Sequence, residues 1–550
     1  MEYIVAEIAA EVEELVKGLY GGEAGLDEIE EGLRRILFTK GNKLLSAMLS
    51  KGAIIGKAEY IRCEKCGGIK ELQSYSSKSY QTLFGEVKVE RPYYYCRRCH
   101  TSEVPYDRKI GMVGRQSSMA LIRSVSRCSA DKPFEEAAEM LEELTGVRIS
   151  AKSSQTISED IGARMGLEIE RDREEIISGG EGKKSNVSPE RLYISADGTR
   201  VCTGAGWKEV KVGAVYETKE ARNKLGEPEI KARGISYLSS FTDCHRFGEY
   251  LWSEAYQRSV KKAKEVIFIS DGGVWLWEIQ RTHFPKAVGI LDWYHASEHV
   301  WGLGKELYGE GTPECLKWVN EQLDLLYGGK AEEFIGNLKG LKFRKKKKAS
   351  VLKEIGYFES NRERMRYDEY RKKGYQIGSG VIESSCKHVV GARLKGAGMR
   401  WSIAGAQNIL NLRLYIKNKK WQDFWNRQKV APFEIKSVQT DNGSEFHKHF
   451  RKSLESKGIE HYFNYPRSPK SNCYVERFNR TIQEQYVNWN KEDLYEPEVF
   501  NYGLMDYLLW YNTEKPHRGL PDKQPPLRYL LASAGLELQQ SNMLWTSTTA

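Results

Sequence analysis

The feature that most constrains this fold is a series of apolar runs between residues 191 and 295. The four segments are RLYISAD, EVKVGAVYE, EVIFISD and AVGILDWYH. In the third and fourth segments, the apolar run leads to an aspartate. Runs of this kind are typical of the buried strands of a mixed sheet. The sequence therefore predicts an α/β core in this part of the chain.

Length and composition narrow the classes of protein. A chain of 550 residues is too long for one core, and at roughly 150 residues per domain we expect three or four domains. The formal net charge of +10 favours a polyanionic partner but is also common on ordinary surfaces. No apolar run approaches the roughly 18 residues of a membrane span. Because the N-terminus is acidic and amphipathic, unlike a secretory signal, we expect a cytoplasmic protein that contacts no membrane.

The order of patterns divides the chain. The segment SGGEGKKSNVSPE (178–190) is rich in Gly, Ser and Lys and marks a boundary. A new strand-and-helix pattern begins near 426–432. The predicted parts are a helical region (1–55), a zinc-ribbon-like domain (56–110), a helical region (111–178), an α/β core (190–425) with a helical insertion at about 296–372, and a partial second unit (432–535).

Helical periodicity appears twice before the core. Apolar residues over 1–50 predict two amphipathic helices with a break at Gly21-Gly22. Residues 131–165 predict short helices, with a turn at Gly146 and a new helix near Ser150. This outline fits a helix-turn-helix, and an ordinary helical hairpin fits it equally well.

Four of the ten cysteines form two CxxC pairs, Cys63-Cys66 and Cys96-Cys99. Two such pairs supply the four thiolates that Zn²⁺ prefers in closed structural sites. The alternatives are a redox pair or thiols without a shared role. We predict a structural zinc ion that stabilises a small domain, one that contacts DNA.

Carboxylates follow or lie within the predicted strands. Asp197 and Asp271 are each followed by glycine, which would let the chain turn beside the carboxylate, and Glu383 lies in the glycine-rich segment IGSGVIESSCKHVV. Three carboxylates brought together would repel one another unless a divalent cation held them. Two Mg²⁺ or Mn²⁺ ions about 4 Å apart would do so and would clamp a phosphodiester during displacement. The pattern predicts a magnesium-dependent phosphodiester chemistry.

The region 191–425 resembles the Mutator-related DDE transposases of bacterial insertion sequences. The matching features are ADGTRV, SDGG followed by FPKAVGILDWYH, and IGSGVIESSCKHVV followed by GMRW. With the cysteine block, the resemblance covers most of residues 1–425. It implies an RNase H-like core with a helical insertion, with Asp197, Asp271 and Glu383 as metal ligands and His295 assisting near the site. A histidine satisfied in the core is the alternative for His295.

Residues 433–530 resemble a second family, the retroviral-integrase-type transposases. VQTDNGSEF contains Asp441, and Glu476 follows it by 35 residues in YPRSPKSNCYVERFNRTIQEQYV, which is the spacing of that family. The earlier strand and first aspartate that this family requires are missing, because the segment before residue 426 belongs to the first resemblance. We therefore expect a fusion: a nearly complete first transposase (1–425) joined to the C-terminal half of an integrase core (432–535).

The two resemblances imply a DNA transposase that hydrolyses a phosphodiester and transfers the freed 3′-hydroxyl to target DNA. They also imply double-stranded DNA as the partner, a homo-oligomer, and a cytoplasmic, nucleoid-associated location in a bacterium. Basic residues are candidates for phosphate contacts, and a solvated surface is the alternative for Lys387, Arg393, Arg400, Lys345 and Lys346. Other functions left open are a catalytically inactive chimeric DNA-binding protein, an RNase H-type nuclease without strand transfer, and activity supplied by Asp441 and Glu476.

Overall fold

The computed structural model describes most of the first 427 residues and short stretches after them. Its residues form two compact units, Met1–Ser118 with Gln422–Ala550, and Met119–Trp421. The described residues are 2–22, 24–63, 65–112, 114–179, 188–222, 226, 228–341, 348–427, 437–440, 450–451, 454, 460–463, 473–491, 494, 500, 504, 507–508, 510–512, 515–517, 520–526 and 529.

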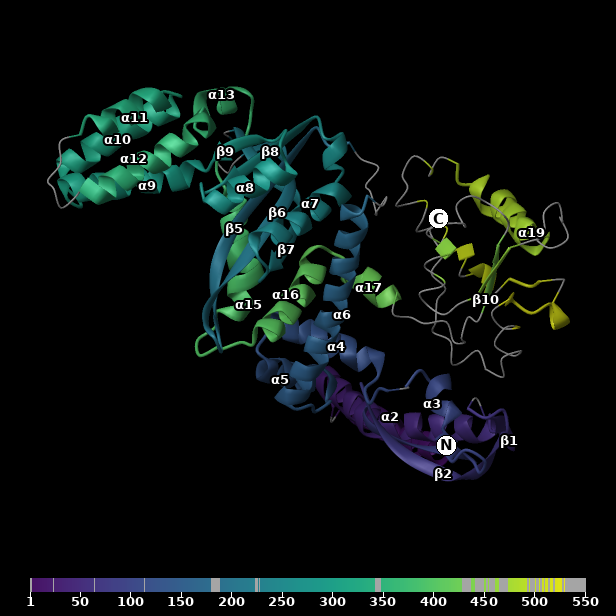
Figure 1. The fold of residues 1–550 in the computed structure, drawn as a ribbon. Coiled ribbons are helices and arrows are strands. Elements are labelled where there is room, and N and C mark those ends of the chain that lie inside the picture. Colours follow the sequence, from purple (N-terminus) through teal and green to yellow (C-terminus); the bar gives the residue numbers. More distant parts are fainter. Residues whose placement is uncertain are drawn as a thin grey trace. The chain divides into compact units, whose positions relative to one another are not determined.

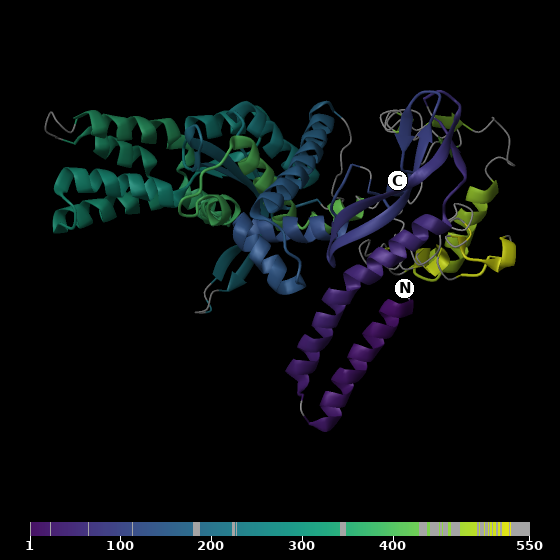
Figure 2. The same cartoon turned by 90° about the horizontal axis from the view of Figure 1, so that it is seen from below.

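The chain begins with a helical hairpin. Helices α1 (Glu2–Gly21) and α2 (Leu26–Ile55) lie side by side, as Figure 2 shows, and Gly22 turns the chain between them with a φ of 71°. A Cβ at Gly32 would collide with Leu15, so this glycine permits the close approach of the two helices. The two predicted helices and their break are confirmed.

The second half of α2 packs on an antiparallel sheet of four strands in the order β1-β2-β3-β4. Val87, Val89 and Tyr80 from the sheet form a buried cluster with Ala53 of α2. The strands and the short helix that follows them are β1 (Tyr60–Arg62), β2 (Ile69–Thr82), β3 (Gly85–Cys96), β4 (Thr101–Glu103) and α3 (Pro105–Lys109).

The second unit is built on a mixed sheet of five strands in the order β7-β6-β5-β8-β9. Strands β5, β8 and β9 run parallel to one another, whereas β6 runs antiparallel to both of its neighbours. The bounds are β5 (Arg191–Thr203), β6 (Gly206–Arg222), β7 (Pro228–Ser240), β8 (Glu265–Ser270) and β9 (Val288–Leu291). The four predicted strands are confirmed. The edge strand β7 was not predicted, because its first half is polar and lacks an apolar run.

In this unit, helices that precede the strands in the sequence pack against helices that follow them. A Cβ at Gly162 of α6 would collide with the backbone carbonyl of Asn408 in α16, so the two helices are in close contact. The predicted boundary at 178–190 therefore lies inside one compact unit. The helices concerned are α4 (Met119–Asp131), α5 (Phe134–Thr145), α6 (Ala151–Ile177), α7 (Cys244–Gln257), α8 (Val274–His283), α14 (Gly380–Ser385), α15 (Ala392–Leu394) and α16 (Ile403–Lys417), with a π-helical turn at Cys386–Gly391.

The turn between α5 and α6 has the predicted chemistry. Gly146 ends α5 in the left-handed conformation, and the Ser150 hydroxyl accepts a hydrogen bond from the amide of Ser153 at the start of α6. The prediction of short helices over 131–165 is wrong for the second one, because α6 continues to Ile177. Its contacts with α16 and α7 stabilise the extra turns.

A group of helices follows β9 and extends from one end of the sheet, as Figure 1 shows. It lies where the sequence predicts a helical insertion, and α9 already begins at Trp293. The members are α9 (Trp293–Tyr308), α10 (Pro313–Tyr327), α11 (Ala331–Lys339), α12 (Lys348–Asn361) and α13 (Tyr367–Lys372).

The C-terminal part contains a small parallel sheet. Strands β10 (Ser437–Thr440) and β11 (Glu460–Phe463) pair in parallel, and helix α19 (Cys473–Ile482) continues into a π-helical turn at Gln483–Val487. Helix α17 (Trp421–Arg427) precedes this part. Within the described residues after 421, β10 and β11 are the two strands of this sheet. No helix in the described ranges is both long and apolar enough to cross a membrane.

Candidate catalytic and metal sites

The register of the second unit's sheet brings three aspartates to the same level. Ser195 of β5 pairs with Ile269 of β8, and Ser270 of β8 pairs with Leu291 of β9. Continuing these parallel registers by one or two residues places Asp197, Asp271 and Asp292 beside one another. Ligand and catalytic sites of α/β sheets commonly lie beyond this end of parallel strands.

Asp197 lies inside β5, not at its end. The strand continues to Thr203, and Gly198 pairs with Lys211 of β6. The prediction that Gly198 turns the chain is therefore wrong; a Cβ there would crowd Glu209 instead. The carboxylate accepts a hydrogen bond from the Gly198 amide at 2.6 Å, and the Cys386 thiol lies 3.6 Å from its other oxygen. Burial, followed by the charge of Asp271, raises the pKa of Asp197.

Asp271 follows β8 directly. Its carboxylate accepts a hydrogen bond from the Gly273 amide at 3.0 Å, and its backbone carbonyl accepts one from the Tyr357 hydroxyl at 2.8 Å. Gly272 has a φ of 92°, and a Cβ there would lie 2.8 Å from the Tyr357 ring. Residue 272 must therefore be glycine, because its backbone conformation is left-handed and the Tyr357 ring leaves no space for a Cβ.

Glu383 lies on α14, which packs against β5 and β6. Its side chain is exposed. Burial, followed by the charges of Asp292, Glu298 and Asp197, raises the pKa of Glu383. Asp197, Asp271 and Glu383 are thus electrostatically coupled, but their oxygens are spread more widely than the ligands of a closed site. In the described part of the chain, only four cysteines bring three or more candidate ligand atoms within 4.8 Å of one another.

Asp292 fixes the segment that leads to Glu383. It is 1% exposed and begins α9, where one oxygen accepts hydrogen bonds from the amides of Tyr294 at 3.1 Å and Ser379 at 3.0 Å. Its other oxygen accepts the Ser379 hydroxyl at 2.6 Å. The amide of Trp293 also donates to the carbonyl of Ile377 at 2.9 Å. These bonds hold the start of α14 against the start of α9. The sequence marked Asp292 only as the end of a strand.

His295 and two further side chains form a hydrogen-bonded line across α9 and α12. Its Nε2 lies 3.2 Å from Nε2 of His299, and Nδ1 of His299 lies 2.6 Å from a carboxylate oxygen of Glu354 on α12. Sequence reasoning missed His299 and Glu354. The spacing of His295 and His299, four residues apart on one helix face, was the available signal for the first. Glu354 lies on another helix and left no signal.

The predicted phosphate contacts fall into three groups. Lys387 and Arg400 are exposed. Arg393 is 1% exposed and buried between Phe134 and Trp401, where it donates to the carbonyl of Ser129 at 2.9 Å. Its prediction as a DNA contact is therefore corrected: its guanidinium holds α4, α5 and α15 together. Lys345 and Lys346 lie outside the described residues.

The four CxxC cysteines converge in the first unit. Cys63 and Cys66 lie in the turn between β1 and β2, while Cys96 ends β3. Sγ of Cys63 lies 3.4 Å from that of Cys99, and Sγ of Cys66 lies 3.6 Å from that of Cys96. These separations fit four thiolates around one Zn²⁺ with bonds of about 2.3 Å. The cluster has the donor set and the spacing of a structural zinc site.

Hydrogen bonds shift the pKa values of the cysteines in this cluster in opposite directions. Burial opposes the thiolate of Cys63, but the Thr101 hydroxyl and the amides of Cys66 and Lys65 lower the pKa of Cys63 to about 6. The amide of Cys63 in turn donates to the carbonyl of Gly68 at 2.7 Å, which closes the first turn. Although the Gly68 amide favours the thiolate of Cys66, burial and the hydrogen bonds with the other three cysteines raise the pKa of Cys66 to about 11, so only part of the cluster favours the thiolate that metal binding requires.

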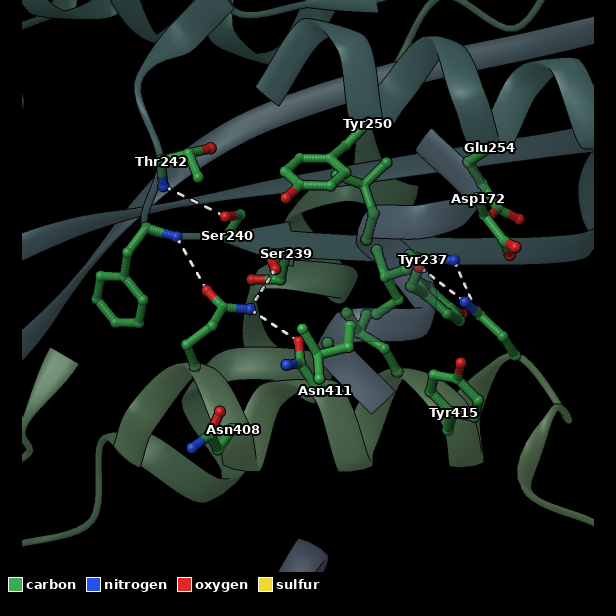
Figure 3. Close-up of a pocket in the computed structure, with 18 of the residues that line it drawn as sticks. Asp172, Tyr237, Ser239, Ser240, Thr242, Tyr250, Glu254, Asn408, Asn411 and Tyr415 are labelled. Atoms are coloured by element: carbon green, nitrogen blue, oxygen red, sulfur yellow. Dashed lines mark hydrogen bonds between the residues drawn. The ribbon is translucent and has the colours of Figure 1, made fainter. Parts of the chain in front are cut away.

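A cavity of the second unit lies away from the candidate carboxylates. It has a volume of about 800 Å³ and lies between α6, α7, α16 and the edge of β7 (Figure 3). Amide side chains of α16 bond to that edge: Gln407 accepts from the amide of Phe241 at 3.1 Å, and Asn418 accepts from that of Tyr237 at 2.8 Å. None of the candidate carboxylates lines this cavity. This cavity is therefore separate from the candidate site.

The candidate pair of the C-terminal part is only half described. Glu476 lies on α19 with its side chain exposed, and Asp441 lies outside the described residues.

Two protein families match different parts of this chain, and the first match ends close to residues 426–432, where the sequence pattern changes. Residues 23–429 match an uncharacterised protein family, UPF0236, and residues 457–525 match an integrase core domain. A UPF0236 protein from the vanSb 3′ region of Streptococcus gallolyticus is 24% identical over 370 residues, which cover 64% of this chain and 76% of that protein. A protein of Spiroplasma virus SpV1-C74 with the provisional name integrase ORF3 is 32% identical over 114 residues, 18% of this chain and 29% of that protein. The chain thus spans less than a third of this viral relative. Because the first match covers more than half of the chain, the protein belongs to the UPF0236 family, and a segment near its C-terminus is similar to integrase core domains.

Proposed function

We propose that this protein is a DNA transposase of the DDE type, in which Asp197, Asp271 and Glu383 form the catalytic centre. The observation that carries the proposal is the sheet register that sets Asp197 level with Asp271, with the helix of Glu383 packed on β5 and β6. In such enzymes a phosphodiester is hydrolysed and the freed 3′-hydroxyl is then joined to target DNA. The similarity of residues 457–525 to integrase core domains supports the same class of chemistry.

The sheet supports an RNase H-like assignment for the second unit. Cores of that class have a five-stranded mixed sheet in which the second strand alone runs against the others. The order β7-β6-β5-β8-β9, with β6 as the antiparallel strand, agrees with this arrangement. The helices α9 to α13 then correspond to an insertion before the glutamate, as in the Mutator-related transposases that the sequence resembles.

The chemistry of the carboxylates fits a hard divalent cation. Three carboxylates offer the oxygen ligands that Mg²⁺ and Mn²⁺ prefer. Burial and neighbouring negative charges raise the pKa of Asp197 and of Glu383, and a bound cation would remove that cost. When bound, two such ions would supply Lewis-acid stabilisation of the charge on the phosphodiester.

The chain's own residues orient these ligands. The amides of Gly198 and Gly273 hold the carboxylates of Asp197 and Asp271. The bonds between Asp292 and Ser379 fix the start of the helix that carries Glu383. A carboxylate held this way loses less conformational freedom when it binds a cation or a substrate.

DNA contacts are assigned to exposed parts of the chain. Lys387 and Arg400 are exposed near the candidate motif and would contact phosphates, and Lys345 and Lys346 are candidates from the sequence alone. The cysteine cluster would hold one structural zinc ion in a domain that we expect to contact DNA, and α5 and α6 are separate candidates for contacts with transposon ends. Transposases generally work as dimers or larger assemblies because two ends must be joined together, so the resemblance leads us to expect a homo-oligomer.

The test is Mg²⁺-dependent cleavage and joining of a duplex that carries the sequences flanking the gene. The Asp271→Asn variant should lose both products and retain DNA binding in a mobility-shift assay. Asp243→Asn is the matched control, because Asp243 begins a helix of the same unit with its side chain in solvent and should leave cleavage unchanged. Wild-type protein that binds this DNA and never cleaves it would instead favour the catalytically inactive DNA-binding chimera.

A further inference from the structure

We propose that His299 and Glu354 are positioning residues for His295, and that the three side chains form one hydrogen-bonded line that ends beside the catalytic carboxylates. The catalytic consequence rests on the proposed function. The line itself is a property of the fold and has a test of its own.

The line begins on two neighbouring helices. His295 and His299 occupy one face of α9, and Glu354 reaches them from α12. These three side chains line a pocket of about 310 Å³ together with Glu298, Glu306 and Ser350. The Glu354 side chain is 17% exposed and that of His299 is 26% exposed, so solvent competes only weakly for their mutual bond.

The contacts fix where the protons lie. A carboxylate only accepts, so Nδ1 of His299, 2.6 Å from Glu354, carries the hydrogen. In the neutral ring Nε2 of His299 is then an acceptor, and the Nε2 of His295 at 3.2 Å must be the donor. This leaves Nδ1 of His295 as the atom that can take up a proton.

The groups around that atom are acidic. Nδ1 of His295 lies 3.6 Å from a carboxylate oxygen of Glu298. The charge of a protonated His295 lowers the pKa of both Asp197 and Glu383, which places the ring within electrostatic reach of the two carboxylates. A protonated His295 held here would donate a hydrogen bond to a phosphodiester oxygen at the catalytic centre.

Tyr357 connects the line to β8. The His299 ring stacks on the Tyr357 ring with centroids 4.1 Å apart and planes 18° apart. The hydroxyl of the same tyrosine donates to the carbonyl of Asp271 at 2.8 Å. The His299 ring is therefore fixed in its plane by stacking and about its axis by Glu354, and the tyrosine that holds it is itself held at the candidate site.

A transition metal shared by the two imidazoles is the competing explanation. Their Nε2 separation is close to the roughly 3.3 Å expected for two ligands of one tetrahedral zinc with bonds of about 2.0–2.1 Å. A zinc site needs a third protein ligand, however, and only the four cysteines form such a group within the described part of the chain. The geometry therefore favours the direct hydrogen bond.

The first experiment determines the protonated nitrogen of each histidine in the line by NMR and needs no activity assay. The ¹⁵N resonances of histidine-labelled full-length protein should show His299 in its Nδ1–H form and His295 in its Nε2–H form, with assignments from His299→Gln and His295→Gln. Glu354→Ala should release the Nδ1–H preference of His299, whereas His245→Ala, which changes an exposed histidine of the same unit, should leave both signals in place. Zinc content should be one ion per chain, lost with Cys63→Ser. A His299 in the Nε2–H form, or a second zinc ion lost with His299→Gln, would overturn the proposal.

The second experiment measures the consequence for cleavage. Glu354→Ala and His299→Ala should lower kcat about 10- to 100-fold with KM for DNA unchanged, as for other residues that orient a reacting group. Glu354→Gln keeps an acceptor oxygen and should restore most of the loss. A rise in KM alone, or no recovery with glutamine, would contradict a positioning role. If wild-type protein cleaves no DNA, the proposed function fails while the resonance test of the line still stands.

Discussion

Single residues decide whether the candidate site is assembled, and Asp292 is the clearest case. Replacement by alanine removes the cap of α9 and leaves the buried amide and hydroxyl of Ser379 without their acceptor. We expect Asp292→Ala to lower the free energy of unfolding by about 2–3 kcal/mol, from a lost cap and unsatisfied buried donors. Urea denaturation of the full chain measures this change.

Asp243 provides the matched comparison for Asp292. It caps α7 by accepting one hydrogen bond from the Arg246 amide at 3.0 Å, and it contacts no distant segment. Asp243→Ala should therefore cost only about 1 kcal/mol. Equal losses in the two variants would show that Asp292 acts as a helix cap alone and does not fix the segment of Glu383.

At the scale of elements, the contact between α6 and α16 depends on Gly162. A Cβ at this position meets the backbone of Asn408, which has no flexible end that can move aside. Gly162→Ala should reduce the free energy of unfolding by about 1–3 kcal/mol through overpacking. Gly336 in α11 has open space around its Cα, so Gly336→Ala should instead stabilise the protein by about 0.5–1 kcal/mol through helix propensity. Thermal denaturation of both variants should show shifts of opposite sign.

An ion-pair network joins α6 to α7 and makes their packing depend on pH. Glu170 accepts from Arg173 and Arg246, each at 2.5 Å, and from the hydroxyl of Tyr250. Although burial opposes its ionised form, hydrogen bonds from Arg173 and Tyr250 lower the pKa of Glu170 to about 2. Since the folded pKa is depressed, this stabilisation is complete above the ordinary value of 4.5 and is lost as the pH falls toward about 2.

Unfolding measured between pH 6 and pH 3 tests this network. The Glu170→Gln variant should be about 2 kcal/mol less stable than wild type at pH 6, and the difference should shrink at acid pH. Glu174→Gln is the control, because Glu174 is largely exposed and lies 3.5 Å from the same arginine. A stability difference for Glu170→Gln that stays constant with pH would contradict the assigned pKa.

At the scale of the whole molecule, local signals predicted the elements that carry them. Apolar runs located β5, β6, β8 and β9, and the paired cysteines located the cluster that the fold assembles. Strand β7 could not be located, because an edge strand bonded to amide side chains of α16 needs little apolar sequence. The length of α6 was missed for a related reason: its later turns are stabilised by another helix far away in the sequence.

In the candidate site, too, residues with a local sequence signal could be predicted and residues that depend on tertiary contacts could not. Asp197, Asp271 and Glu383 could be chosen from motifs, whereas Arg393 looked like a surface cation and is buried, because its partners come from α4 and α5. Glu354 and Ser379 could not be chosen, since their roles arise only where the insertion helices return to the sheet. Side chains that orient others through tertiary contacts leave no periodic or spaced pattern in the sequence.

We propose that the second unit, and not the integrase-like segment, performs the chemistry. The most direct measurement is Mg²⁺-dependent cleavage and joining of flanking DNA by the full chain and by four variants in parallel. We predict that Asp271→Asn and Glu383→Gln lose both products, while Asp441→Asn and Glu476→Gln retain wild-type rates. Loss of cleavage in Asp441→Asn with full activity in Asp271→Asn would contradict the account and assign the chemistry to the C-terminal segment.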